Sequence, residues 1–275
     1  MAHSSDELLS HKIATIVSWL LAAYASFRYF VGINPFDNHN PYNVRETPFS
    51  SNVVVTLTFW GFLFLLQILF VTQIFVPTVN NASGITNRLE VTKLIAWHFS
   101  AFNLGVFVWT LLFVHNHYFW SEVVLVLNFV NILLLYFEHK TYSVKPFSNW
   151  LLIHLPTAAF PFSWLLYAIF WNGAVLFHVH KLVGRIFANI LIWLFLLVPG
   201  FFLVVFNDYG IGISSSWLMF GLGLGQLFTK TFALQWIFAF VISGLLFIGS
   251  VVGAVTGSVT SRETTNETAP LMNDA

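Results

Sequence analysis

The sequence has few charged residues. Only 8% of its 275 residues are Asp, Glu, Lys or Arg, whereas 57% are apolar. A soluble domain carries roughly 25% charged residues, because its surface must be solvated. Eleven basic and eleven acidic residues cannot cover the surface of a folded chain of this length. We therefore expect most of the surface to face lipid.

Cysteine is absent, and the formal net charge is zero. The lack of cysteine excludes disulfides, thiolate metal sites and cysteine nucleophiles. The charge balance leaves no basic face for nucleic acid and no polybasic patch for anionic lipid. The signatures of P-loop proteins, G-x-S-x-G hydrolases and H-E-x-x-H metalloproteases are missing too. The sequence therefore favours a non-enzymatic role over an enzymatic one.

Apolar runs long enough to cross a membrane dominate the chain. A transmembrane helix needs about 20 residues, and all its backbone groups must be paired internally. The sequence predicts an all-α, polytopic integral membrane helix bundle with seven or eight transmembrane spans, since 211–228 is short enough to be re-entrant. The eight runs are 13–32, 53–76, 94–114, 119–137, 160–179, 184–206, 211–228 and 232–255.

Polar ends flank one membrane domain. We expect residues 1–12 to be a cytosolic N-terminal segment, 13–257 a single transmembrane helical domain, and 258–275 a disordered cytosolic tail. A small excess of Lys and Arg on the side of the termini assigns that side to the cytosol. Pro156 and Pro161 should separate a short interfacial helix near 148–158 from a span that starts near Phe160, because proline breaks helical hydrogen bonding.

No ionisable residue lies near the middle of a predicted span. This argues against proton relays, voltage sensors and ion-coupled transport. Glu122 comes nearest, and we expect it in the first turn of its helix, where a carboxylate complements the helix dipole. Neutral polar residues within the spans predict either interhelical hydrogen bonds or a ligand-binding cavity. The candidate cavity residues are His98, Asn103, Asn128, Asn131 and Asn172.

Two H-x-H pairs fall at the membrane face away from the termini. Neutral histidine nitrogens bind zinc, and zinc is the one cofactor that the sequence suggests. The candidate metal ligands are His115, His117, His178 and His180. A Thr–His intramembrane hydrolase, which would pair Thr56 or Thr58 with His98 or His154, is a weaker alternative because such pairs arise by chance.

Glycines recur at four-residue spacing in the last two predicted spans. In lipid, small residues at this spacing let helix backbones approach closely. They favour tight packing of these spans, a homo-oligomer or contact with another membrane protein. The residues are Gly221, Gly225, Gly249, Gly253 and Gly257.

The C-terminal tail contains a sorting pattern. Glu267 precedes Leu271 and Met272 by four and five positions, as in acidic-dileucine signals. Such signals resemble those that adaptor coats read when they route proteins to vacuoles or lysosomes. We therefore expect an endomembrane location, with the vacuolar membrane as the specific hypothesis.

Three segments resemble a fungal protein family. They read IHLPTAAFPFSWLLYAIFWNGAVLFH, RIFANILIWLFLLVPGFFLVVFNDYGIG and GLGLGQLFTKTFALQWIFAFVISGLLF, and GQLFTKTFALQWIFAF is the most specific block. They look like fungal multi-spanning membrane proteins that are catalogued only as a domain of unknown function. The similarity runs from about Val53 to Gly257 and implies a fungal endomembrane protein. The family has no established activity, so the resemblance assigns no catalytic residue.

Three functions follow as hypotheses. The first is binding or transport of a small apolar or amphipathic molecule. The second is a structural or adaptor subunit that packs on a partner through its glycine grooves. The third is an intramembrane lipid-modifying enzyme. The lipid bilayer is the expected environment in all three, and nucleic acid is not an expected partner.

Overall fold

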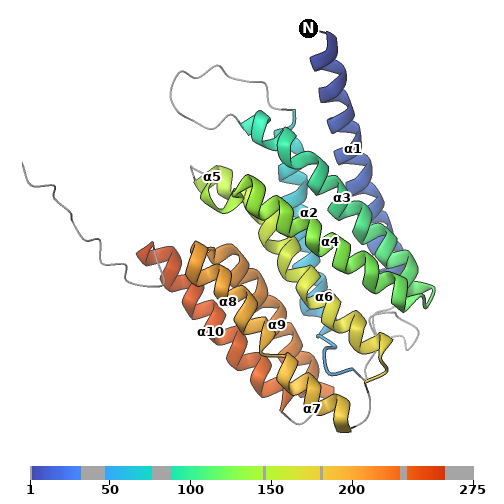
Figure 1. Cartoon of the computed structure of the whole chain (residues 1–275), viewed down its shortest axis with the longest axis vertical. Helices are drawn as coiled ribbons and strands as arrows, with labels where there is room; N and C mark the ends of the chain where they lie inside the picture. The colour runs from blue at the N-terminus through green and yellow to red at the C-terminus, as the bar shows by residue number, and fades with distance from the viewer. Residues whose placement is uncertain are drawn as a thin grey trace, which may run out of the picture.

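The chain folds into a bundle of long helices (Figure 1). A computed structural model describes residues 2–31, 47–75, 88–144, 147–179, 182–229 and 234–257, and no strand occurs in these ranges. Seven helices within them are long and apolar enough to cross a membrane. The predicted all-α membrane bundle is therefore confirmed. The tail with Glu267, Leu271 and Met272 lies outside the described residues, so the vacuolar location stays a prediction.

The helices follow one another along the chain. In chain order they are α1 (Ala2–Ser26), the π-helical turn η1 (Phe27–Val31), α2 (Val53–Gln73), α3 (Arg88–Val114), α4 (Tyr118–His139), the 3-10 turn η2 (Thr141–Ser143), α5 (Phe147–Asn149), the π-helix η3 (Trp150–Ala159), α6 (Phe160–Leu176), α7 (Leu182–Leu191), α8 (Leu194–Phe206), α9 (Tyr209–Thr229) and α10 (Gln235–Thr256).

Two of the predicted spans, 13–32 and 211–228, compare differently with the structure. The run 211–228 lies in α9, one continuous helix of 21 residues whose length and composition fit a full span. Residues 13–31 of the run 13–32 lie in α1 and η1, which are not among the seven candidate spans in the described ranges, whereas α7 and α8 together form one of them, Val183–Phe206. Residues 2–12 also belong to α1. This helix packs against α3, where the rings of His11 and Trp97 lie 5.1 Å apart.

The prediction that the prolines separate two helices is wrong. Residues Phe147–Leu176 form one continuous helix of 30 residues. Its middle, η3, has π-helical pairing, in which the Phe160 N–H bonds the Leu155 carbonyl. A π-helix is wider than an α-helix, and this width accommodates Pro156. The Thr157 hydroxyl donates to the Ile153 carbonyl at 2.6 Å, so a side chain helps to satisfy the altered backbone.

The helix formed by α5, η3 and α6 is the centre of the bundle. Of its most apolar window, 89% is buried inside the protein, against 28% for α4, so lipid covers α4 more than it covers this helix. Trp164 is fully buried, with its ring 4.9 Å from Trp60 and 6.1 Å from Trp109. The aromatic residues of this helix therefore join α2 and α3 to it.

Serine hydroxyls fasten α9 to the helices beside it. Ser163 on α6 lies 2.7 Å from Ser214 and 2.8 Å from Ser215, oxygen to oxygen. The Ser216 hydroxyl donates to the Ser243 carbonyl on α10 at 2.8 Å. Interhelical bonds of this kind are each worth about 0.6 kcal/mol on average in membrane proteins.

The glycine motifs make contacts within the chain. A Cβ on Gly221 would lie 2.7 Å from the Ser51 hydroxyl, and one on Gly225 would lie 2.6 Å from the Ser50 carbonyl, so both glycines face the start of α2. Gly249 on α10 faces Leu203 of α8. Gly253 is buried in α10, and Gly257 ends that helix with a φ of 77°. A role of these glycines in a homo-oligomer stays a prediction.

Candidate functional site

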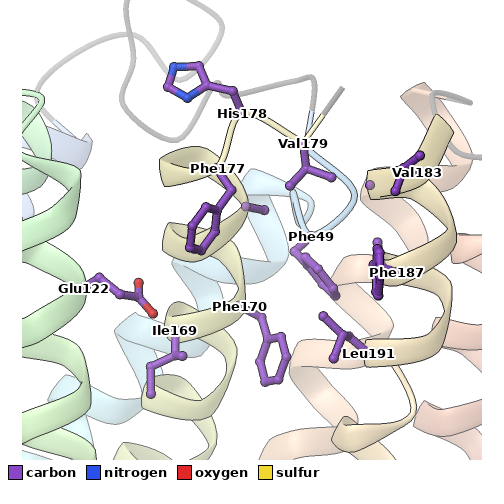
Figure 2. A pocket seen from close by; sticks show the side chains of 14 residues that line it. Phe49, Glu122, Ile169, Phe170, Phe177, His178, Val179, Val183, Phe187 and Leu191 are labelled. Atoms are coloured by element: carbon purple, nitrogen blue, oxygen red, sulfur yellow. The ribbon is translucent and has the colours of Figure 1, made fainter. Parts of the chain in front are cut away.

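A large cavity opens between α6 and α7 (Figure 2). Its volume is about 860 Å³. Its apolar lining includes Phe49, Phe170, Phe177, Phe187 and Leu191. A second hollow, of about 490 Å³, lies along α4 and shares Phe177 and Glu122 with the first. The larger hollow forms an apolar groove between α6 and α7, and the smaller one adjoins it.

Glu122 is the acidic side chain among the described residues of this cavity. It reaches from α4 toward α6 (Figure 2). The Asn172 side-chain N–H donates to Glu122 Oε2 at 2.7 Å. The other oxygen, Oε1, lies 3.8 Å from the position that a Cβ on Gly173 would take, so it faces the cavity wall. The expected place of Glu122 in the first turn is wrong, because α4 begins at Tyr118 and carries no acidic residue there.

Asn172 connects α6 to α4. Its side-chain oxygen accepts a hydrogen bond from the Ser121 hydroxyl at 2.7 Å. Its side-chain nitrogen donates to the Tyr118 carbonyl at 3.1 Å and to Glu122. The side chain is fully buried. Asn172 therefore acts as an interhelical link that also orients the cavity carboxylate.

Replacing Asn172 with leucine should destabilise the protein by about 2 kcal/mol, because the buried Ser121 hydroxyl and two partly buried oxygens, of Tyr118 and Glu122, lose a partner. Thermal denaturation of the purified protein in detergent measures this loss. Thr58→Val is the matched control, since this exposed hydroxyl donates only to the Val55 carbonyl of its own helix. A normal melting temperature with impaired function would instead assign Asn172 to ligand binding.

The other four predicted cavity residues lie on α3 and α4, and three of them link the two helices. The Asn131 side chain contacts His98 through two hydrogen bonds, and the Asn128 side chain donates to the Phe102 carbonyl at 3.0 Å. Asn103 donates to the Phe99 carbonyl of its own helix. None of the five residues lines the 860 Å³ cavity. Interhelical hydrogen bonding accounts for the contacts of His98, Asn128 and Asn131, and a shared ligand-binding role of the five residues stays a prediction.

Three of the four predicted metal-binding histidines lie in the described residues, and these three are exposed. His115 and His117 lie between α3 and α4, and His178 follows α6 at the rim of the cavity (Figure 2). The Nδ1 atoms of His115 and His178 contact the Leu111 and Leu176 carbonyls at 2.7 Å and 3.1 Å. His180 lies outside the described residues. A metal site at these histidines stays a prediction.

A buried polar network was missed in the sequence. His154 Nε2 lies 3.0 Å from Asp208 Oδ1, and His154 Nδ1 lies 2.9 Å from the Thr141 hydroxyl. His154 is 0% exposed and Asp208 1%. Asp208 Oδ1 also accepts the Ile211 N–H at 3.1 Å and so caps α9. The buried Tyr136 hydroxyl lies beside the Asp208 carboxylate without a well-aligned hydrogen bond to it.

This network differs from the predicted threonine–histidine pairs. Thr56 donates to the Asn52 carbonyl and Thr58 to the Val55 carbonyl, whereas His154 contacts Thr141. Neither of the two cavities above is lined by Thr141, His154 or Asp208. Its contacts instead join three elements: Thr141 of η2, His154 of η3 and the N-terminus of α9, which Asp208 caps. The available signal was an aspartate, a residue type favoured at helix N-caps, just before the run 211–228.

Comparison with known proteins gives a family match over part of the chain. Residues 185–272 match the family described as "Fungal protein of unknown function (DUF1774)". The chain is also 36% identical over 84 residues to "Uncharacterized protein C637.03" of Schizosaccharomyces pombe. That alignment covers 30% of this chain and 30% of the relative, so it spans less than a third of the relative's length. No solved structure matches the chain. Over residues 185–272, the predicted resemblance to a fungal family of unknown function is thus confirmed.

Proposed function

We propose that this membrane protein binds a small amphipathic molecule in the groove between α6 and α7. The observation that supports this proposal is an apolar cavity of about 860 Å³ that contains one carboxylate. Ligand sites in proteins are typically apolar cavities of 300–1,000 Å³ with a few oriented polar groups. The ligand would place an alkyl chain against Phe170, Phe177 and Phe187 and its polar head at Glu122.

The head group would determine which ligand binds. Within a bilayer, an alkyl chain that enters an apolar groove leaves an environment that is equally apolar, so its transfer contributes little free energy. A carboxylate that faces an apolar groove is costly and favours a partner of opposite charge or a hydrogen-bond donor. Glu122 would therefore select a ligand with a cationic or hydrogen-bond-donating head, such as a long-chain amine.

Photo-crosslinking with a long-chain alkyl amine that carries a diazirine in its chain tests the proposal. We expect labelling on peptides that contain Phe170 or Phe187. Gly173→Leu, which fills the wall beside Glu122, should reduce this labelling at least tenfold. Glu122→Gln keeps an acceptor for Asn172 and removes the charge, so it should weaken labelling by the amine more than labelling by an uncharged alkyl probe.

The labelling of lipid-facing positions provides the control. Leu65 and Val241 are exposed apolar residues outside the cavity. Equal labelling of peptides from these positions and from the groove would mean that the probe samples the whole lipid surface. That result would contradict the proposal.

The two other hypotheses have less support. The surface of Gly221 and Gly225 that would bind a partner helix packs on the start of α2. A lipid-modifying enzyme would need a reactive group at a cavity, and the buried His154 lines neither of the two described above. Binding in the groove therefore accounts for more of the described structure than either alternative.

A further inference from the structure

His98, Glu138 and His139 form a cluster at the other end of α4 from Glu122. One side-chain ligand atom from each of the three residues lies within 4.8 Å of the others. The His98 Nε2 atom lies 3.9 Å from Glu138 Oε2, and the ring centroids of His98 and His139 are 5.5 Å apart. His98 comes from α3 and the other two residues from α4, so the cluster bridges two helices.

Asn131 determines which nitrogen of His98 carries a proton. The Asn131 side-chain N–H donates to the His98 carbonyl at 3.0 Å. Because a carbonyl only accepts, the amide nitrogen of Asn131 must lie at this contact, and its oxygen must then face the ring. That oxygen is 2.8 Å from His98 Nδ1. The His98 Nδ1 atom is therefore the donor, and in a neutral ring Nε2 presents a lone pair.

This lone pair points toward another acceptor. The atom opposite His98 Nε2 is a carboxylate oxygen of Glu138. Two acceptors that face each other repel unless a cation or a proton lies between them. At metal sites, the ring N–H of a ligand histidine usually donates to a second residue, which fixes the tautomer and the orientation of the ring. Asn131 holds His98 in this way.

We propose that His98, Glu138 and His139 bind a zinc ion at the membrane interface. Two histidines and one glutamate are a known ligand set for zinc, and three protein ligands leave a fourth tetrahedral position open to water. Bonds of about 2.1 Å at tetrahedral angles bring ligand atoms to within about 3.4 Å of one another. The side chain of Glu138 is 63% exposed, so it is free to rotate and close the remaining distance.

The zinc site is independent of the proposed ligand groove. Glu122 and Glu138 are separated by 16 residues of α4, which at 1.5 Å per residue is about 24 Å. His98, Glu138 and His139 line neither of the two cavities described above. An ion at this site would tie α3 to α4. The zinc site also differs from the one predicted at His115, His117, His178 and His180. His115 and His117 lie between the end of α3 and the start of α4, and His178 follows α6.

Zinc titration of the full-length protein in mild detergent tests the site. The protein is first stripped with a chelator and then titrated with zinc chloride against a chromophoric competitor. We expect one zinc per chain. Glu138→Gln should weaken binding at least tenfold, and His139→Gln about a hundredfold. Asn131→Ala should weaken zinc binding by about 10- to 100-fold, the range found for residues that hydrogen-bond a metal ligand. Cobalt bound in place of zinc should show tetrahedral d–d absorption.

The double variant His115→Gln with His178→Gln is the matched control, because it also removes two histidines. It should bind zinc as the wild type does. Loss of zinc in this double variant, with full binding in Glu138→Gln, would overturn the proposal and place the metal at the other histidines. Absence of stoichiometric zinc in the wild type would also overturn it. Glu138→Gln alters an exposed side chain, so its loss of zinc is separable from misfolding by gel filtration.

Discussion

Replacing Asp208 with alanine is expected to destabilise the protein by about 3 kcal/mol. The substitution leaves His154 Nε2 buried without its acceptor, which costs about 1–3 kcal/mol. It also removes the cap that accepts the Ile211 N–H, and a lost N-cap costs about 1 kcal/mol. Thermal denaturation in detergent, followed by tryptophan fluorescence, measures the change in melting temperature.

Asp208→Asn is the control for this substitution. Asparagine keeps the shape of the side chain and one oxygen that can accept the Ile211 N–H or bond His154. We therefore expect a loss of stability smaller than that of the alanine variant. An alanine variant as stable as the wild type would contradict a structural role for the network. A stable alanine variant that no longer supports the function of the protein in cells would instead indicate that Thr141, His154 and Asp208 take part in a reaction.

Gly225→Ala is expected to cost about 3 kcal/mol, at the upper end of what overpacking usually costs. The new Cβ would lie 2.6 Å from the Ser50 carbonyl oxygen, 2.7 Å from the Ser51 carbonyl carbon and 2.8 Å from the Asn52 nitrogen. These are backbone atoms, which cannot rotate away as the end of a side chain can. The added methyl group must therefore push α9 from α2.

The backbone that the new methyl group would meet is held on several sides. The Gln226 side-chain N–H group donates to the Ser50 carbonyl at 2.9 Å, and the Asn52 N–H donates to the Gly221 carbonyl at 2.9 Å. The Tyr167 hydroxyl accepts the Ser51 N–H at 3.2 Å and donates to the Phe49 carbonyl at 2.7 Å. A shift of this segment therefore breaks hydrogen bonds to both α9 and α6.

Gly244→Ala is the matched control for Gly225→Ala. A Cβ on Gly244 meets nothing within 4 Å, so alanine there should stabilise α10 by about 0.5–1 kcal/mol. Melting temperatures of the two variants in detergent should move in opposite directions. If instead Gly225→Ala changed the oligomeric state and left the melting temperature of the chain unchanged, the glycine groove would bind a second copy, as one of the sequence-based hypotheses holds.

The architecture was predictable because lipid imposes length and composition on each span. Seven of the eight runs correspond to helices that are long and apolar enough to cross a membrane. The error at Pro156 has a physical cause. The expectation that proline breaks a helix assumes α-helical hydrogen bonding, but η3 has π-helical hydrogen bonding. The Thr157 hydroxyl also donates to the Ile153 carbonyl there. No feature of the apolar sequence around Pro156 indicated this change of pairing.

The candidate sites were less predictable because they depend on contacts between distant residues. Asn172 was recognisable as a polar residue within a span, but its three partners on α4 were not. Glu122 was assigned to the helix dipole because its neighbour on α6 could not be known. Asp208 stands between the runs 184–206 and 211–228 in the sequence, which does not indicate that it lies against His154, 54 positions earlier. Residue spacing shows which side chains share a helix face, but not which helices meet.

Native mass spectrometry of the protein purified in mild detergent from its own membranes tests the central claim most directly. The account predicts one small amphipathic molecule with a cationic or hydrogen-bond-donating head on each wild-type chain, and none on Gly173→Leu. A wild-type chain with no bound molecule would contradict binding in the groove between α6 and α7. The same molecule retained on Gly173→Leu would contradict it as well, because the ligand would then occupy another part of the protein.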